Sequence, residues 1–200
     1  MEEIKNLIFD VGGVLIGYRW QDMLMIDRGL DSERAMQVGM APFNDESWSD
    51  FDAGRLSIKD ILKIHKEKSP DLYEDLEWFL LNNHLMKKKR PKVAREVKRL
   101  KEKGYNIYIL SNYSEELFSI HTDGEEFWDY VDGRVVSYEL GKLKPQIEIY
   151  QAILEKYNLS ANECMFFDDR KENVEGAESA GIKGFLVISE DELIKELKKY

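Results

Sequence analysis

Five short runs of apolar residues constrain the fold of this chain more than any other feature. They are NLIFDV (6–11), NIYILS (106–111), RVVSY (134–138), CMFFDD (164–169) and GFLVIS (184–189). Each run is apolar almost throughout rather than alternating with polar residues. This pattern is typical of strands that are covered on both faces, as in a parallel sheet. Helical segments separate most of the runs, so the sequence predicts an α/β, doubly wound parallel sheet.

Helix boundary signals agree with this order. Pro91 can occupy a first helical turn, and Gly104 can end the same helix before the strand that begins at Asn106. Pro145 is expected to open a further helix, and Ser189 to cap the last one. From about residue 88 onward, helices and strands therefore alternate.

Residues 18–86 have a different pattern. They contain no convincing strand and several amphipathic helical segments, one capped by Ser57 and another preceded by Asp71. We therefore expect residues 1–17 and 87–200 to form a core, with 18–86 as an all-helical insertion. The insertion follows the first strand, where α/β sheets bind ligands, so it is positioned to act as a lid.

Composition limits the classes of partner. The 200 residues are 43% hydrophobic and 34% charged, with a formal net charge of −10, which disfavours nucleic acid as a partner. The basic run 87–103 is interpreted as a solvated helix face. Cys164 is the only cysteine, the N-terminus is unlike a signal peptide, and no apolar run could span a bilayer. We expect a cytoplasmic protein that does not bind membranes.

Polar residues follow the predicted strands where several of them end. They are Asp10, Ser111, Asn112, Lys144, Asp168 and Asp169, with Asn173 shortly after. The carboxyl ends of parallel strands meet at one edge, so these groups should share one crevice. Three carboxylates in a crevice favour a hard divalent cation such as Mg²⁺, and an ammonium and a hydroxyl beside it can hold a phosphate.

These residues resemble the four motifs of the haloacid dehalogenase-like hydrolase superfamily, in order along the chain. The motifs are IFDVGGVL, YILSNYS, LGKLKPQIEIY and FFDDRKENVEGA. The helical insertion is similar to the C1 cap of that superfamily. The last two motifs look closest to a branch that contains bacterial α-D-glucose-1-phosphate phosphatases, and the phosphatase domain of soluble epoxide hydrolase has a similar last motif.

The resemblance implies a Mg²⁺-dependent phosphatase acting on a small phosphorylated molecule. Asp10 would attack phosphorus and form an aspartyl-phosphate that water hydrolyses. The resemblance assigns metal binding to Asp10, the Gly12 carbonyl, Asp169 and Asp168. It assigns phosphate binding to Ser111, Asn112 and Lys144, and Lys144 would also act in catalysis. Asn173 would hold these site residues in position.

Gly12 departs from the superfamily pattern. Most of its phosphatases have a second aspartate at that position, which protonates the leaving group and then activates water. Such a group typically contributes about 10²–10⁴-fold. Its loss favours an easily leaving alcohol such as that of a sugar 1-phosphate, unless a water or a residue of the insertion replaces it.

Two alternatives remain at this point. One is a weakly catalytic or non-catalytic protein that binds a phosphorylated ligand, which Gly12 supports. The other is a 2-haloacid dehalogenase, which would need no metal and is disfavoured by Asp168 and Asp169. Aromatic residues of the insertion (Trp20, Trp48 and Phe51) are interpreted as its core rather than as substrate contacts.

Overall fold

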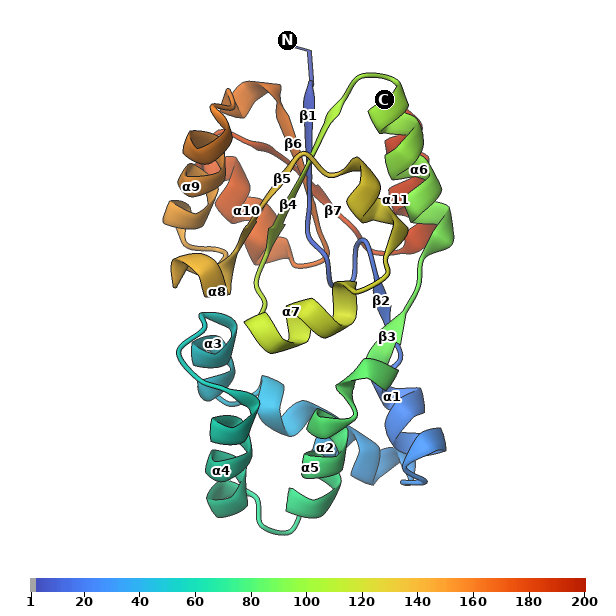
Figure 1. Ribbon diagram of the computed structural model, residues 1–200, viewed down its shortest axis with the longest axis vertical. Coiled ribbons are helices and arrows are strands. Elements are labelled where there is room, and N and C mark those ends of the chain that lie inside the picture. Colours follow the sequence, from blue (N-terminus) through green and yellow to red (C-terminus); the bar gives the residue numbers. More distant parts are fainter. Residues whose placement is uncertain (1–2) are drawn as a thin grey trace.

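A computed structural model describes residues 3–200 (Figure 1). Its main sheet has five parallel strands in the order β5-β4-β1-β6-β7. The strands are β1 (Asn6–Phe9), β4 (Asn106–Ser111), β5 (Gly133–Val136), β6 (Cys164–Asp168) and β7 (Lys183–Leu186). Each lies within or beside one of the predicted runs, so the predicted α/β parallel sheet is confirmed.

Helices cover both faces of the sheet. On one side pack α6 (Pro91–Glu102) and α11 (Glu190–Leu197), and on the other α9 (Ile147–Tyr157) and α10 (Lys171–Ser179). The central strand has alternating contacts: Leu7 and Phe9 belong to the hydrophobic cluster that contains α6 and α11, whereas Ile8 belongs to that of α9 and α10. Shorter elements complete the core: α7 (Glu115–Thr122), α8 (Ser137–Leu140), η3 (Glu126–Tyr130) and η4 (Ala161–Glu163).

Most predicted helix boundaries are confirmed. Pro91 is the first residue of α6, and Gly104, with φ of +97°, follows its end. The Ser189 side chain accepts a hydrogen bond from the Glu192 backbone and caps α11. The prediction that Pro145 opens a helix is wrong by two residues. A turn in which the Gln146 N–H donates to the Leu143 carbonyl comes first, at 2.8 Å, and α9 begins only at Ile147.

Between residues 20 and 86 the chain is helical. The elements are α1 (Trp20–Asp22), η1 (Met23–Asp27), α2 (Ser32–Phe43), α3 (Ser47–Asp52), α4 (Ile58–Lys68), α5 (Tyr73–Leu81) and η2 (Asn83–Met86). Ser57 caps α4 in a reciprocal capping box with Asp60, as its sequence predicts. These helices lie together below the sheet in Figure 1, opposite the carboxyl ends of its strands. We call them the helical insertion.

A two-stranded ribbon joins the helical insertion to the core. It pairs β2 (Gly17–Tyr18) with β3 (Lys87–Lys88) in antiparallel orientation. The expectation that residues 18–86 contain no strand is therefore wrong at Tyr18. Two residues are too few for an alternating pattern, and their partner lies about 70 positions along the chain, so the sequence carried no local signal.

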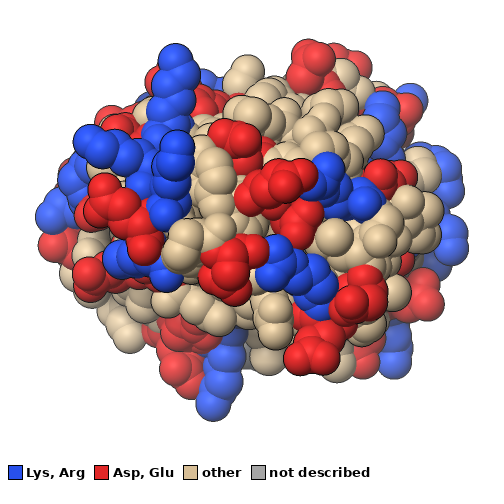
Figure 2. Space-filling model, turned by 90° about the horizontal axis from the view of Figure 1, so that it is seen from below, with Lys and Arg blue, Asp and Glu red and all other residues tan. Residues whose placement is uncertain are grey.

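The surface of the helical insertion carries charges of both signs. Figure 2 looks onto this face and shows acidic and basic side chains interspersed with other residues. Such mixing does not create the field of one sign that attracts a polyanion. Within residues 3–200, no helix combines the length and the apolar character that crossing a membrane requires.

Candidate active site

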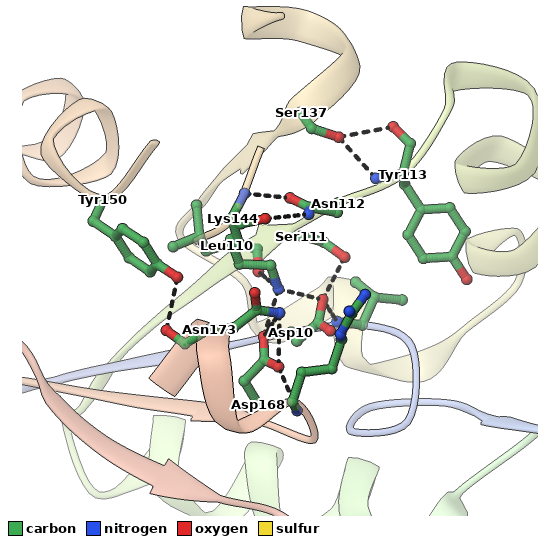
Figure 3. Close-up of polar contacts among 12 residues, drawn as sticks. Asp10, Leu110, Ser111, Asn112, Tyr113, Ser137, Lys144, Tyr150, Asp168 and Asn173 are labelled. Atoms are coloured by element: carbon green, nitrogen blue, oxygen red, sulfur yellow. Dashed lines mark hydrogen bonds and ion pairs between the residues drawn. The ribbon is translucent and has the colours of Figure 1, made fainter. Parts of the chain in front are cut away.

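Asp10 lies directly after the central strand, at the edge where neighbouring strands also end. Since β1 pairs with β4 on one side and with β6 on the other, Asp10 is flanked by Ser111 and Asp168 (Figure 3). Its carboxylate accepts hydrogen bonds from the Val11 N–H, at 2.7 Å, and from the Ser111 hydroxyl. These two donors fix one carboxylate oxygen, and the side chain is only 11% exposed.

Lys144 connects Asp10 to Asp168. Its Nζ lies 3.0 Å from Asp10 Oδ1 and 2.6 Å from Asp168 Oδ2, and it donates to the Leu110 carbonyl at 3.1 Å (Figure 3). Burial alone would lower the pKa of Lys144, but attraction to the two carboxylates outweighs it, so the pKa is raised. The ammonium is therefore charged and has three partners.

Asp168 is held by several donors. Besides Lys144, the Asn173 Nδ2 donates to its two oxygens at 3.0 and 3.2 Å, and the Arg170 N–H donates at 2.8 Å. Asn173 is fixed in turn, because its backbone carbonyl accepts a hydrogen bond from the Tyr150 hydroxyl at 2.7 Å. Asp168 therefore acts as an anchor for the Lys144 ammonium.

Three carboxylates meet at this edge of the sheet. One oxygen from each of Asp10, Asp168 and Asp169 lies within 4.8 Å of the others. Burial raises the pKa of Asp10 to about 7, opposed by Lys144 and reinforced by the two neighbouring aspartates. Burial and the charge of Asp168 likewise raise the pKa of Asp169. The negative charge here is incompletely compensated by the protein, and a divalent cation would compensate it.

The glycine turn after β1 makes room for this cluster. A Cβ added to Gly13 would lie 2.1 Å from Asp169 Oδ2, and the φ of +74° at Gly13 also favours glycine. The Arg90 guanidinium holds the turn by donating to the carbonyls of Gly13 and Val14, the latter at 3.0 Å. Nothing in the sequence pointed to Arg90, whose basic run is otherwise solvated helix surface.

Asn112 is brought to the site, but its side chain has another function there. Its Nδ2 donates to the Lys144 carbonyl at 3.0 Å, and its Oδ1 accepts from the Lys144 N–H at 2.8 Å. This pair of hydrogen bonds ties the Lys144 turn to the end of β4. The sequence predicted Asn112 as a phosphate-binding residue and gave no signal for this contact between its side chain and the Lys144 backbone.

Two connected groups of side chains line the space above Asp10. A cavity of about 220 Å³ contains Asp10, Gly12, Lys144, Asp169 and Asn173 in its lining. A second cavity of about 260 Å³ has mainly apolar walls, which include Trp20, Phe43, Trp48, Leu80, Met86 and Leu117. Both cavities share residues Tyr18, Trp48, Asp52, Asn112 and Tyr113 as lining, so they adjoin.

The three aromatic residues of the helical insertion singled out from the sequence differ in their surroundings, since some border the apolar cavity and one does not. Phe51 is 1% exposed and belongs to the core, as expected. Trp20 and Trp48 are half-buried and pack against the same hydrophobic core, as expected, but both also line the apolar cavity. Only the packing of the helical insertion against the core determines that these two residues border a cavity.

Comparisons with known proteins agree with this geometry. The model of the haloacid dehalogenase-like hydrolase family matches residues 4–181. A sesquiterpene phosphatase of Aspergillus oryzae is 28% identical over 182 residues, covering 90% of this chain and 88% of the relative. A D-ribitol-5-phosphate phosphatase of Bacteroides thetaiotaomicron is 25% identical over 201 residues, 91% of each chain.

The fold is also similar to solved structures. One is an enzyme of the haloacid dehalogenase-like (HAD) family from Bacteroides thetaiotaomicron, solved in complex with magnesium and inorganic phosphate. It superposes with a TM-score of 0.69 at 22% identity and covers 92% of this chain and 93% of that one. This likeness supports the α/β core with its helical insertion. With the family match over residues 4–181 and relatives that are phosphatases, the chain belongs to the haloacid dehalogenase-like hydrolase family.

Proposed function

We propose that this protein is a Mg²⁺-dependent phosphomonoester hydrolase in which Asp10 is the nucleophile. The observation that carries the proposal is the Asp10 carboxylate itself, oriented by Ser111 and Lys144 at the base of a cavity with two further aspartates beside it. In the proposed reaction, Asp10 attacks phosphorus and forms an aspartyl-phosphate, which water then hydrolyses. Named phosphatases among the relatives support the same class of reaction.

The carboxylate cluster fits a magnesium ion. Mg²⁺ prefers oxygen ligands and retains several waters, so it needs few protein groups. Asp10, Asp169 and the Gly12 carbonyl would hold it, because Lys144 and Asn173 already occupy the Asp168 carboxylate. When bound, the cation would offset the negative charge that keeps a carboxylate away from a phosphate.

The phosphate would be held by groups on the opposite side of Asp10. The Lys144 ammonium and the Ser111 hydroxyl both lie within hydrogen-bond distance of Asp10 and can contact an oxygen on phosphorus. The backbone N–H of Asn112 is proposed as a further donor. Since Asn112 also binds the backbone of Lys144, it would keep the phosphate-binding groups in register.

Two substrate classes fit different features of the site. A sugar 1-phosphate, expected from Gly12, has a leaving group that needs little protonation. The D-ribitol-5-phosphate phosphatase supports a polyhydroxylated organic group, but not the anomeric leaving group, because its named substrate is a primary phosphate ester. The apolar cavity favours a second class, lipophilic phosphomonoesters, because Trp20 and Trp48 offer apolar surface rather than hydrogen bonds. The sesquiterpene phosphatase relative supports this class.

A comparison of two substrates, each assayed separately, distinguishes these classes. Wild-type protein with Mg²⁺ would be given a sugar 1-phosphate and a prenyl phosphate, and released phosphate would be measured for each. If the apolar cavity binds the organic group, Trp20→Ala, which changes the lining of that cavity only, raises KM for the prenyl ester alone. An unchanged KM for the prenyl ester in Trp20→Ala contradicts the lipophilic class.

The alternatives make different predictions in the same assay. A phospholigand-binding protein would show phosphate affinity without turnover, and a dehalogenase would release halide from a 2-haloacid without metal. We expect Mg²⁺-dependent phosphate release that Asp10→Asn abolishes, because the amide is not a nucleophile. Phosphate release that persists in Asp10→Asn would contradict the proposal.

A further inference from the structure

The position of the missing acid at Gly12 is filled by another side chain. A Cβ built on Gly12 would lie 2.3 Å from Tyr18 Oη and 3.0 Å from Tyr18 Cζ. The phenol thus occupies the space that a longer residue at position 12 would need. Tyr18 is therefore the first candidate for the proton donor to the leaving group.

The hydrogen-bond chain that begins at Tyr18 excludes it from that role. His121 Nε2 lies 3.1 Å from the Asn83 carbonyl oxygen, which can only accept, so Nε2 carries a proton. Burial lowers the pKa of His121 to about 4, so the ring is neutral and its Nδ1 accepts from the Tyr113 hydroxyl at 3.1 Å. Tyr113 has then donated its proton, and it accepts from Tyr18.

The Tyr18 proton consequently points away from the site. Tyr18 is 38% exposed as a whole residue and lines both cavities, but its hydroxyl is desolvated, which raises its pKa above the ordinary value. Tyr18 presents only lone pairs toward Asp10. A different group must supply the proton.

Asp52 is the remaining acid in the lining that the two cavities share. It is the last residue of α3, and its backbone carbonyl accepts from the Ser137 hydroxyl, which also accepts from the Tyr113 N–H at 2.8 Å. This contact ties the helical insertion to the core at the Asp52 backbone.

Both the position and the protonation of Asp52 suit proton transfer. An ester whose phosphate occupies the smaller cavity and whose organic group occupies the apolar one would have its bridging oxygen beside the lining that the two cavities share, which includes Asp52. Burial, followed by the charge of Asp10, raises the pKa of Asp52 to about 7. A group with that pKa exchanges protons readily at neutral pH.

We propose that Asp52 is the general acid and base of the reaction at Asp10, an assignment that rests on the proposed function. As the Asp10 oxygen bonds to phosphorus, the bond to the leaving oxygen breaks, and that oxygen takes the Asp52 proton to become an alcohol. Water then attacks phosphorus, the bond to Asp10 breaks, and the water proton returns to Asp52. Inorganic phosphate leaves, and both aspartates regain their initial states.

Leaving-group dependence tests this assignment without knowledge of the natural substrate. The Asp52→Asn variant is assayed with Mg²⁺ on 4-nitrophenyl phosphate, whose phenolate leaves unaided, and on phenyl phosphate, whose phenolate is more basic. We expect kcat/KM for phenyl phosphate to fall about 10²–10⁴-fold and that for 4-nitrophenyl phosphate to fall much less. Hydrolysis of the aspartyl-phosphate should slow, so 4-nitrophenolate should appear in a burst.

Two further variants serve as controls. Asp50→Asn carries the same substitution on an exposed position of α3 and should keep the wild-type ratio between the two esters. Tyr18→Phe should also keep that ratio, because its proton is not used. Turnover of 4-nitrophenyl phosphate by Asp52→Asn reports that this variant is folded.

The outcomes are distinguishable. If Asp52→Asn lowers kcat/KM equally for both esters, the Asp52 assignment alone is contradicted. The same holds if Tyr18→Phe, rather than Asp52→Asn, lowers kcat/KM more for phenyl phosphate than for 4-nitrophenyl phosphate. A wild-type protein that cleaves neither ester with Mg²⁺ present contradicts the proposed function and this assignment together.

Discussion

Replacing Gly12 by alanine tests whether Tyr18 is what excludes a side chain from position 12. The new methyl carbon would lie 2.3 Å from Tyr18 Oη and 3.0 Å from Tyr18 Cε2, whereas favourable separations are about 3.5–4.0 Å. The phenol must therefore move by about 1 Å or more, which breaks its hydrogen bond to Tyr113. The backbone itself is not the obstacle, because the φ angle of Gly12 is not positive and alanine can adopt it.

The expected cost follows from these two changes. Overpacking typically destabilises by about 1–3 kcal/mol, and a lost hydrogen bond by about 0.5–1.5 kcal/mol. Together they give about 1.5–4.5 kcal/mol, or about 3–18 °C in Tm for a chain of this length. Thermal unfolding followed by circular dichroism measures this shift.

A double-mutant cycle identifies the cause. In a Tyr18→Ala background the contact is absent, so Gly12→Ala should cost less than about 1 kcal/mol there. Gly17→Ala, where the nearest atom to the added Cβ is the flexible Arg90 Nε at 3.3 Å, is the matched control and should change Tm little. An equal cost of Gly12→Ala in both backgrounds would refute the argument.

Three further predictions concern charge, metal and capping. Lys144→Met leaves Asp10 and Asp168 without their cation, so urea unfolding at pH 8 should show a loss of about 3–5 kcal/mol, with a smaller loss at pH 5, where Asp10, with its raised pKa, takes up a proton; an equal loss at both pH values would contradict the pairing. The raised pKa of Asp10, about 7, means that metal-free protein loses stability as pH rises from about 4 through 7, so Mg²⁺ should raise Tm more at pH 8 than at pH 5.5 in a fluorescence melt; a shift independent of pH would contradict a site at Asp10. Ser57→Ala removes the capping-box acceptor from Asp60 N–H and should destabilise by about 1 kcal/mol in thermal unfolding, while Ser57→Asp, which keeps an acceptor, should not.

The sheet was predictable because its three central strands, β1, β4 and β6, are almost entirely buried and therefore apolar on both faces. A short apolar run such as CMFFDD (164–169) is more readily explained as a buried strand than as any other element, and all five strands occur where such runs lie. The ribbon of β2 and β3 was not predictable, since each strand has two residues and is defined by its partner. The start of α9 was misplaced because a turn that ends at Gln146, not proline alone, decides where that helix begins.

The candidate site was predictable only where it depends on the sheet. Asp10, Ser111 and Asp168 lie at the ends of adjacent strands, so parallel topology brings them together. Tyr18 reaches the site from the β2–β3 ribbon and Asp52 from the helical insertion, and the position of each depends on packing against the core, which a single sequence does not specify. That is why a vacancy at Gly12 could be inferred from the sequence, but not what fills it.

The central claim is that Asp10 carries the phosphoryl group, and chemical trapping of that intermediate tests it most directly. Wild-type protein turning over 4-nitrophenyl phosphate with Mg²⁺ is quenched in acid and reduced with borohydride, which converts an aspartyl-phosphate to homoserine. Peptide mass spectrometry should find homoserine at position 10, only when Mg²⁺ is present, and not at Asp168 or Asp169. Phosphate release with no modification at Asp10, or with homoserine at another aspartate, would contradict the account.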